Sequence, residues 1–160
     1  MKDYCYYQSP IGQLMLIGTN GVLEELLFPN EVQEKSIDAG FQHNEKIFEP
    51  VLKQLREYFA GKRQRFSLKL APNGTEFQQR VWQELCNIPY GQTTSYGEVA
   101  SRLGNPKGGR AVGMANGKNP IPIIVPCHRV IGKDGSLTGF GGGLDIKRHL
   151  LDLENQSRKI

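Results

Sequence analysis

Residues 93–119, "TTSYGEVASRLGNPKGGRAVGMANGKN", decide how the second half of the chain folds. Ser95 and Glu98 have the spacing of a capping box and predict that a helix begins here. Gly104 is typical of the residue that follows a helix end, and a second helix is predicted beyond it. Two short helices joined by a tight turn that contains glycine predict a helix-turn-helix.

The second of these helices is rich in glycine. Asn105 can cap it and Pro106 fits its first turn, so we expect it to begin there and to include Gly108 and Gly109. Each glycine destabilises a helix by roughly 0.5–1 kcal/mol relative to alanine. A helix that keeps several glycines despite this cost indicates a surface without side chains, which a partner molecule can approach closely. With Arg110 beside the glycines, a nucleic acid is the natural partner. A thin internal helix packed against a sheet is the alternative.

Basic residues gather around these two helices. Residues 1–71 carry nine Lys or Arg against nine Asp or Glu, so the net charge of +4 comes entirely from residues 72–160. Residues 92–133 hold six basic side chains against Glu98 alone. This excess predicts a surface that binds a polyanion. The six basic residues are Arg102, Lys107, Arg110, Lys118, Arg129 and Lys133.

A third helix is predicted before the helix-turn-helix, in "TEFQQRVWQELCN". Thr75 and Gln78 fit a capping box at its start. Its apolar side chains recur at helical spacing, which is far more often a core face than a ligand site. These side chains are Phe77, Val81, Trp82 and Leu85.

The first part of the chain instead alternates strand-like runs with turns. The runs are "YCYYQ", "QLMLIG" and "VLEELLF", and turns are expected at residues 10–12, 20–21 and 29–30. The Asn20–Gly21 pair between two apolar runs predicts a hairpin. A helix is expected near Glu49, with Pro50 in its first turn.

We therefore expect an α/β chain of two lobes. Residues 1–70 would form a small N-terminal α/β lobe with antiparallel strands, and residues 71–160 a mostly helical lobe that contains the helix-turn-helix. No apolar run reaches the roughly 18–20 residues needed to cross a bilayer, and the N-terminus lacks the pattern of a signal peptide. These features predict an intracellular, cytoplasmic protein; with a nucleic acid as partner, it would also need access to the nucleoid in a prokaryote or be nuclear in a eukaryote.

Cys127 is the cysteine whose surroundings suggest chemistry. The three cysteines have the spacing of neither a disulfide framework nor a zinc site, so no metal is expected. In residues 123–132, "IIVPCHRVIG", Cys127 directly precedes His128, after "IIV", which has the pattern of a buried strand. Cys127 is either a buried structural thiol or a nucleophile activated by the histidine. Neighbours in a strand point to opposite faces, so a Cys–His pair requires a turn here.

The order of motifs in residues 74–154 resembles one family, the O6-alkylguanine-DNA alkyltransferases, also called methylated-DNA–protein-cysteine methyltransferases. The motifs are "FQQRVWQEL", "IPYGQTTSYGEVA", "NPKGGRAVG", "NPIPIIVPCHRVI" and "LTGFGGGLDIKRHLL". The first 70 residues resemble the family's ribonuclease H-like N-terminal domain only in length and strand-rich character. By this resemblance, residues 71–160 are the DNA-binding and alkyl-transfer domain, a winged helix-turn-helix-like lobe that carries the active site.

The resemblance implies a DNA repair protein. It would flip O6-alkylguanine, and less readily O4-alkylthymine, out of duplex DNA and transfer the alkyl group irreversibly to Cys127, so that each molecule reacts once. It implies no cofactor. The partner would be alkylated double-stranded DNA, bound by a monomer through the minor groove largely without regard to sequence.

The resemblance also implies roles for individual residues. Cys127 would be the nucleophile, His128 would deprotonate it through a water, and Glu154 would orient the imidazole, as in other activated nucleophiles. Tyr96 would press on the 3′ phosphate and donate a hydrogen bond to the flipped base. Arg110 would enter the base stack and fill the space that the nucleotide leaves.

The base pocket is implied in the same way. The carbonyls of Cys127 and Val130 would accept from the guanine amino group, and the backbone N–H of Gly141 would donate to O6. Phe140, where many members carry tyrosine, and Pro122 would line the pocket; Gly141 stands where some members carry serine. The other DNA-binding residues that the resemblance implies are Gly108, Gly109, Ala111 and Asn119, the last as a hinge.

Two rival functions are open on the residues alone. A Cys–His hydrolase would use the same thiol, but it needs an oxyanion-hole loop and leaves the basic helix-turn-helix without a role. A DNA-binding regulator would use the helices and keep Cys127 as a structural residue.

Overall fold

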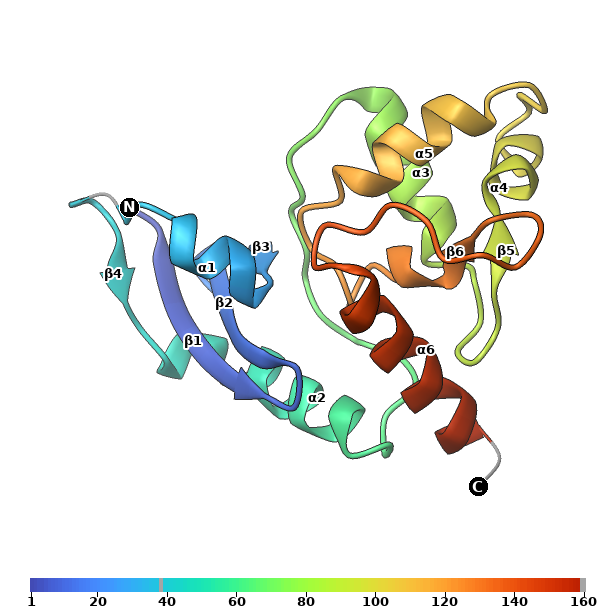
Figure 1. Ribbon diagram of the computed structural model, residues 1–160. Coiled ribbons are helices and arrows are strands. Elements are labelled where there is room, and N and C mark those ends of the chain that lie inside the picture. Colours follow the sequence, from blue (N-terminus) through green and yellow to red (C-terminus); the bar gives the residue numbers. More distant parts are fainter. Residues whose placement is uncertain (38, 159–160) are drawn as a thin grey trace. The chain divides into compact units, whose positions relative to one another are not determined.

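The computed structural model describes residues 1–37 and 39–158, which divide into two compact units, Met1–Pro72 and Asn73–Ile160 (Figure 1). The first unit contains β1 (Asp3–Ser9), β2 (Gly12–Thr19), β3 (Val22–Leu27), α1 (Pro29–Glu34), β4 (Gln42–His43), the 3-10 helix η1 (Lys46–Phe48) and α2 (Glu49–Phe59). The second contains α3 (Glu76–Leu85), β5 (Thr94–Ser95), α4 (Tyr96–Arg102), α5 (Gly109–Gly117), the 3-10 helix η2 (Cys127–Arg129), β6 (Val130–Ile131) and α6 (Leu144–Arg158). The expected fold class, a strand-bearing lobe followed by a mostly helical one, is confirmed.

The first unit is built on one sheet with the strand order β3-β2-β1-β4. The β1, β2 and β3 strands are antiparallel, and β4 runs parallel to β1. The expected hairpin between β2 and β3 is confirmed, and Asn20 and Gly21 both have positive φ, 53° and 81°. Met15 and Ile17 of β2 are buried together with Leu27, and α1 packs against this cluster.

The two α-helices of the first unit both begin with a proline in the first turn. The α2 helix begins at Glu49 with Pro50 in that turn, as expected. Residues 29–30 were expected to form a turn but begin α1 instead, because the Glu31 carboxylate accepts from the Phe28 N–H and caps the helix. A proline at the first position of a helix loses no hydrogen bond, since that N–H has no helical partner.

In the second unit, α3 supports α5. The expected capping box of α3 is present, with Thr75 and Gln78 bonded to each other's backbone N–H. Trp82 of α3 is buried, and its Nε1 donates to the carbonyl of Ala115 on α5 at 2.9 Å. Figure 1 shows α3 and α5 side by side. The α3 helix therefore fixes the face of α5 that is turned away from solvent.

The α4 helix begins at the expected place but is capped on one side only. The Ser95 hydroxyl accepts from the Glu98 N–H at 3.1 Å, whereas the Glu98 carboxylate pairs with Arg102 instead of closing the box. Gly104 follows the helix with φ of 83°, a left-handed conformation that glycine adopts without strain.

The α5 helix begins at Gly109, so the expectation that Asn105 caps it was wrong. The N–H of Asn105 donates to the carbonyl of Ala100 at 2.9 Å, which is the bond that closes the end of α4. Residues 105–108 then form a separate turn, in which the Gly108 N–H donates back to Asn105. Asn105 thus ends one helix instead of beginning the next.

Within the residues that the structure describes, no helix is both long and apolar enough to cross a membrane.

Candidate active site

The chain reaches the candidate nucleophile through a buried turn. A strand was expected at residues 123–125, but residues 121–125 form a turn closed by a bond from the Val125 N–H to the Ile121 carbonyl at 2.9 Å. Ile123 has φ of 74°, which is rare for a β-branched residue and costs on the order of 1–3 kcal/mol. Its side chain is 1% exposed. The apolar run was expected to form a strand, yet its burial here stabilises a strained turn.

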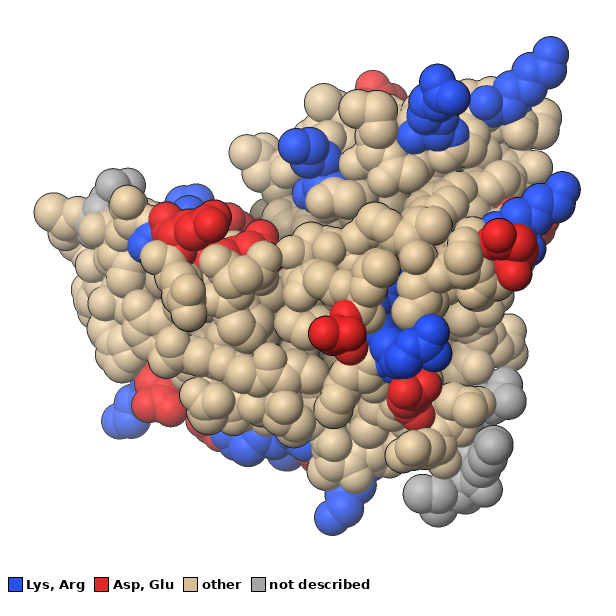
Figure 2. All heavy atoms as spheres, viewed as in Figure 1, with Lys and Arg blue, Asp and Glu red and all other residues tan. Residues whose placement is uncertain are grey.

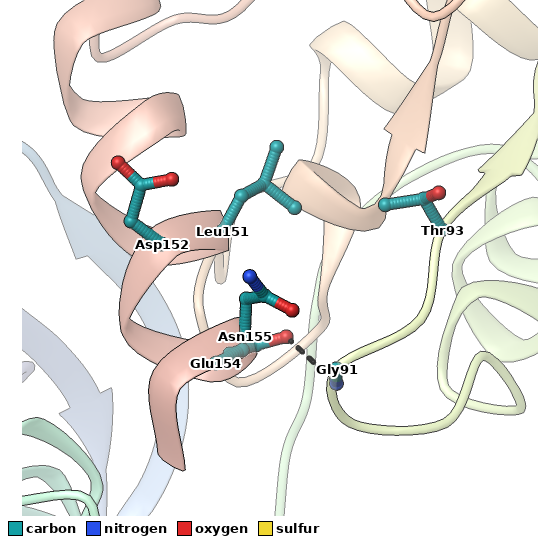
Figure 3. A pocket seen from close by; sticks show the side chains of 6 residues that line it. All are labelled: Gly91, Thr93, Leu151, Asp152, Glu154 and Asn155. Atoms are coloured by element: carbon teal, nitrogen blue, oxygen red, sulfur yellow. Dashed lines mark hydrogen bonds between the residues drawn. The ribbon is translucent and has the colours of Figure 1, made fainter. Parts of the chain in front are cut away.

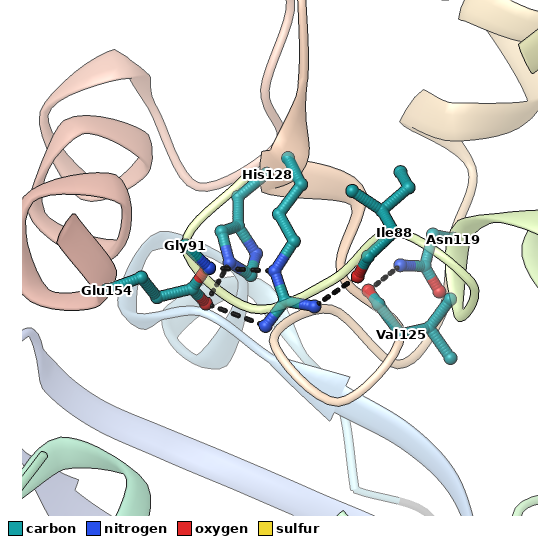
Figure 4. Close-up of polar contacts among 7 residues, drawn as sticks. Ile88, Gly91, Asn119, Val125, His128 and Glu154 are labelled. Carbon is teal, nitrogen blue, oxygen red and sulfur yellow. Dashed lines mark hydrogen bonds and ion pairs between the residues drawn. The ribbon is translucent and has the colours of Figure 1, made fainter. Parts of the chain in front are cut away.

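Two asparagines hold the backbone around the thiol. Asn119 donates from Nδ2 to the Val125 carbonyl at 2.8 Å (Figure 4) and accepts at Oδ1 from the Ile121 N–H at 3.0 Å. Asn116, buried on α5, donates to the Cys127 carbonyl at 3.4 Å. Cys127 itself is 4% exposed. These side chains tie the candidate nucleophile to the end of the helix-turn-helix.

His128 follows Cys127 within the 3-10 helix η2, which supplies the turn that a Cys–His pair requires. Its Nε2 lies 2.6 Å from Oε2 of Glu154, and its side chain is fully buried. An ionised carboxylate can only accept, so Nε2 carries the hydrogen. Nδ1 is buried and has no hydrogen-bond partner among the described residues. The histidine therefore presents a lone pair that can accept a proton.

Arg129 holds the same carboxylate from a second direction. Its Nε and Nη2 donate to Oε1 and Oε2 of Glu154 at 2.8 and 3.0 Å, and its Nη1 donates to the Ile88 carbonyl at 2.8 Å (Figure 4). Glu154 also accepts from the Gly91 N–H at 3.3 Å. Arg129 is only 6% exposed, so counting it among the surface cations was wrong. Its charge is matched inside the unit by a carboxylate from α6.

The electrostatics keep Glu154 ionised and His128 neutral. Burial alone would raise the pKa of Glu154, but hydrogen bonds from His128 and Arg129, together with the positive charge of Arg129, hold it below its ordinary value. Burial lowers the pKa of His128, and its hydrogen bond to Glu154 only partly opposes this. A neutral imidazole beside a thiol is the protonation state that a general base requires.

Lys147 of α6 is a second buried charge near the thiol. Its side chain has no exposed surface, and its Nζ donates to the carbonyls of Val130 at 2.7 Å and Thr138 at 3.0 Å. The Phe140 ring lies 5.8 Å from the same ammonium. Burial lowers the pKa of Lys147, and the negative charge of a Cys127 thiolate opposes this. One ammonium therefore joins the end of the thiol-bearing turn to residues 138–140.

Tyr96 lies at the start of α4 and contacts this same segment. Its hydroxyl is 2.9 Å from Oγ1 of Thr138. A side chain at Gly113 of α5 would approach the Tyr96 ring, with a Cβ only 3.6 Å from Cδ1. Tyr96 is thus placed between α5 and the segment that carries Phe140.

Two of the other expected DNA-binding residues lie on the exposed face of the helix-turn-helix. Arg110 and Ala111 are exposed on α5, and Figure 2 shows basic side chains over α4 and α5. Gly108, in contrast, is buried, and a Cβ there would lie 2.6 Å from Nδ2 of Asn105. A Cβ on Gly109 would lie 3.7 Å from the Gly97 Cα. Of these two glycines, only Gly108, which directly precedes α5, has neighbours closer to a Cβ than ordinary contact distance.

The expected base-pocket residues differ in exposure. Pro122 and Val130 are buried, Phe140 is half-buried, and Gly141 is exposed. A side chain at Gly141 would meet no atom within 4 Å. Val130 and Phe140 are brought together through their shared contact with Lys147.

A hollow of about 290 Å³ lies beside α6 and is lined in part by Glu154 (Figure 3). Because Glu154 lines it while Cys127 does not, it is not the expected base pocket. No group of three or more His, Cys, Asp or Glu in residues 1–37 and 39–158 is arranged to hold a metal ion. The residues that line the hollow are Gly91, Thr93, Leu151, Asp152, Glu154 and Asn155.

The sequence did not predict the roles of three residues at this site, Asn116, Arg129 and Lys147. Arg129 and Lys147 look like ordinary surface cations in the sequence, and Asn116 sits in a helix that was interpreted through its glycines. One signal was available for Lys147, because it stands seven residues before Glu154 and thus on nearly the same face of the predicted helix.

Together, the fold and the site define a helix-turn-helix protein whose helices support a buried Cys–His–Glu arrangement. Two family models match this chain: residues 76–156 match the DNA-binding domain of 6-O-methylguanine DNA methyltransferase, and residues 3–72 its ribonuclease-like domain. The chain belongs to the 6-O-methylguanine DNA methyltransferase family.

Similar proteins support this assignment. The methylated-DNA–protein-cysteine methyltransferase of Methanosarcina acetivorans is 50% identical over 94% of this chain and 97% of its own length. The protein of the same name from Mycolicibacterium paratuberculosis is 50% identical over 98% of this chain and 94% of its own. The crystal structure of Mycobacterium tuberculosis OGT in complex with DNA matches with a TM-score of 0.90 and 48% identity, over 97% of this chain and 94% of that one.

Proposed function

We propose that this protein repairs O6-alkylguanine in DNA by transferring the alkyl group to its own Cys127. Membership of the 6-O-methylguanine DNA methyltransferase family supports the substrate and the reaction class. The observation that carries the assignment to Cys127 is the neighbouring histidine. His128, the residue after Cys127, donates a hydrogen bond from Nε2 to Glu154 at 2.6 Å. The lone pair of its Nδ1 is left to accept a proton.

The chemistry is a displacement at the alkyl carbon. His128 accepts the thiol proton, directly or through a water, and Glu154 stabilises the imidazolium that forms. The Cys127 sulfur then bonds to the alkyl carbon while the bond from that carbon to O6 breaks. Guanine takes the electron pair of the broken bond and the proton held by the His128 imidazolium, which returns the histidine to its neutral form. Water does not remove the alkyl group from the thioether, so each molecule reacts once. The reaction needs no cofactor.

The substrate base must leave the duplex to reach a thiol that is 4% exposed. In the proposed complex α5 lies in the minor groove, and Arg110, exposed on α5, fills the space left in the base stack. Tyr96 contacts the 3′ phosphate and the flipped base. O4-alkylthymine would react more slowly than O6-alkylguanine. A monomer would bind largely without regard to sequence, since guanines must be found in every sequence context.

The base pocket is proposed around Val130, Phe140, Gly141 and Pro122. The carbonyls of Cys127 and Val130 would accept from the guanine amino group; here they accept from Asn116 and Lys147. A carbonyl oxygen has two lone pairs, so the Val130 carbonyl can hold Lys147 and the base at once. The N–H of the exposed Gly141 would donate to O6.

The test is a mass spectrum of the intact protein after incubation with duplex DNA that contains O6-methylguanine. We expect a mass gain of about 14 Da on Cys127, at one methyl per molecule, and none in Cys127→Ala. A Cys–His hydrolase or a DNA-binding regulator with a structural cysteine predicts no adduct. Transfer of the methyl group by Cys127→Ala would overturn the assignment of the nucleophile.

The flipping step has a separate test. Arg110→Ala should slow transfer from duplex DNA far more than transfer from free O6-benzylguanine, because only the duplex requires a base to be unstacked. Equal losses on both substrates would argue against a role of Arg110 inside the duplex.

A further inference from the structure

Met114 is an apolar side chain in an unusual place. It is 69% exposed on α5, whereas the core-facing positions of the same helix are filled by Val112, Ala115 and Asn116. The core of the unit therefore does not need Met114. A single exposed methionine costs little, but this one lies on the helix face that the proposed function turns toward DNA.

The neighbours of Met114 on that face are basic. Arg110 precedes it by four residues and Lys118 follows it by four, so the three side chains form one row along the helix. All three are exposed. Successive members of the row are about 6 Å apart along the axis. Ala111 and Gly117, also exposed, leave the sides of the row open.

An apolar group between two cations fits the surface of a nucleic acid duplex. The cations match phosphates, while the walls of the minor groove are sugar carbons and base edges that an apolar group can cover. Methionine suits this use because its unbranched, polarisable side chain adapts to an irregular surface. A protein partner with acidic residues would satisfy the cations, but the same face carries Arg110, which the proposed function places in DNA.

We propose that Met114 is a DNA-binding residue that packs its thioether against the minor-groove wall one helical turn from Arg110. The proposal rests on the proposed function and adds an apolar, salt-independent contact to it. By seating α5 in the groove, Met114 positions Arg110 for entry into the base stack. Its contribution is therefore confined to duplex substrates.

The experiment compares three variants on duplex DNA and on free O6-benzylguanine. Met114→Ala removes the contact, Met114→Gln keeps the length but not the apolar character, and Met114→Leu keeps both. We expect Ala and Gln to weaken duplex binding about five- to tenfold and Leu to bind like wild type. Transfer from the free base should not change in any of them. Gln83→Ala, which truncates an exposed side chain on α3, is the matched control and should have no effect.

Salt dependence distinguishes Met114 from its basic neighbours. Met114→Ala should weaken binding by the same factor at every salt concentration, so that the slope of log K against log salt is unchanged. Lys118→Ala should reduce the size of that slope by about 0.9, the effect of one lost phosphate contact.

Three results would overturn the proposal. One is duplex binding by Met114→Ala within about twofold of wild type. Another is an equal loss on the free base, which would mean a damaged fold. The third is a loss in Met114→Leu as large as in Met114→Ala, since leucine keeps the apolar contact. If wild type forms no adduct with alkylated DNA, the proposed function itself is wrong; an adduct without a Met114 effect overturns only this inference.

Discussion

Replacing Glu154 by glutamine should damage both the stability and the chemistry of the second unit. Glu154 is 1% exposed and accepts hydrogen bonds from Arg129, His128 and the Gly91 N–H. Glutamine has nearly the same shape, but it has no charge and presents an NH₂ group to donors. Arg129 is then left buried without a counter-charge. Breaking a buried ion pair by removing one partner costs about 3–5 kcal/mol, and we expect a loss in that range.

The chemistry should fail for a different reason. In wild type, the ionised carboxylate forces the hydrogen onto Nε2 of His128 and leaves Nδ1 as the acceptor. The amide of Glu154→Gln can donate to Nε2 instead, which moves the hydrogen to Nδ1 and removes the base. A wrong histidine tautomer can cost up to roughly 10⁴-fold in rate, so transfer should slow by several orders of magnitude.

Urea unfolding and single-turnover transfer measure the two effects separately. Trp82 is the only tryptophan in the sequence and is buried in the second unit, so its fluorescence reports the unfolding of the unit that holds the site. Arg129→Met is the matched control, because it breaks the same ion pair but leaves the bond between His128 and Glu154. It should lose comparable stability and keep far more of the transfer rate.

The double variant Glu154→Gln/Arg129→Met should lose less stability than the sum of the two separate losses, because no unpaired charge is then left buried. Wild-type transfer rates in folded Glu154→Gln would refute the proposed role of Glu154 in orienting the base. A stability loss below about 1 kcal/mol would refute its role as a structural anchor.

Three further predictions concern other parts of the site. The free energy of unfolding should fall as the pH drops below about 6.5, because the pKa of His128 is lowered in the folded protein and the unfolded chain therefore binds a proton at this histidine first. The pKa of Glu154 is also lowered in the folded protein, so a second loss should follow below about 4.5. Unfolding midpoints measured across this pH range would check both. Lys147→Met should release the two carbonyls that its ammonium holds, so that amides near residue 138 exchange hydrogen faster while those of α3 do not. Ser95→Ala should destabilise the second unit by about 1 kcal/mol, whereas Glu98→Gln should have almost no effect, because the Glu98 carboxylate makes only a surface ion pair.

The sequence predicted the elements whose signals are local. The hairpin at Asn20–Gly21, the capping box of Thr75 and the proline start of α2 depend on residues next to one another, and all three are confirmed. The start of α5 was misplaced because Asn105 fits two local motifs equally well. Only the bond from its N–H to Ala100 shows that it belongs to the end of α4.

The site was less accessible to sequence reasoning because its polar contacts span the unit. The sequence around Arg129 is typical of a surface cation. Its buried ion pair with Glu154, 25 residues later, is formed only by the fold. A strand was predicted before Cys127 because the apolar run there fits a buried strand as well as it fits a buried turn. The positive φ of Ile123 could not be predicted, since β-branched residues rarely adopt it. The residues expected at the thiol came from resemblance, while their hydrogen bonds came from the structure.

The α6 helix holds the active site by two buried charges on one face. Lys147 bonds to the carbonyl just after the thiol-bearing turn, and Glu154, two turns later, bonds to the base and its neighbouring arginine. Both contacts come from α6, so neither forms until that helix has folded against the rest of the second unit. Under the proposed function, a chain in which α6 is undocked has its cysteine but lacks the carboxylate that orients the base. We therefore expect the docking of α6 to activate Cys127.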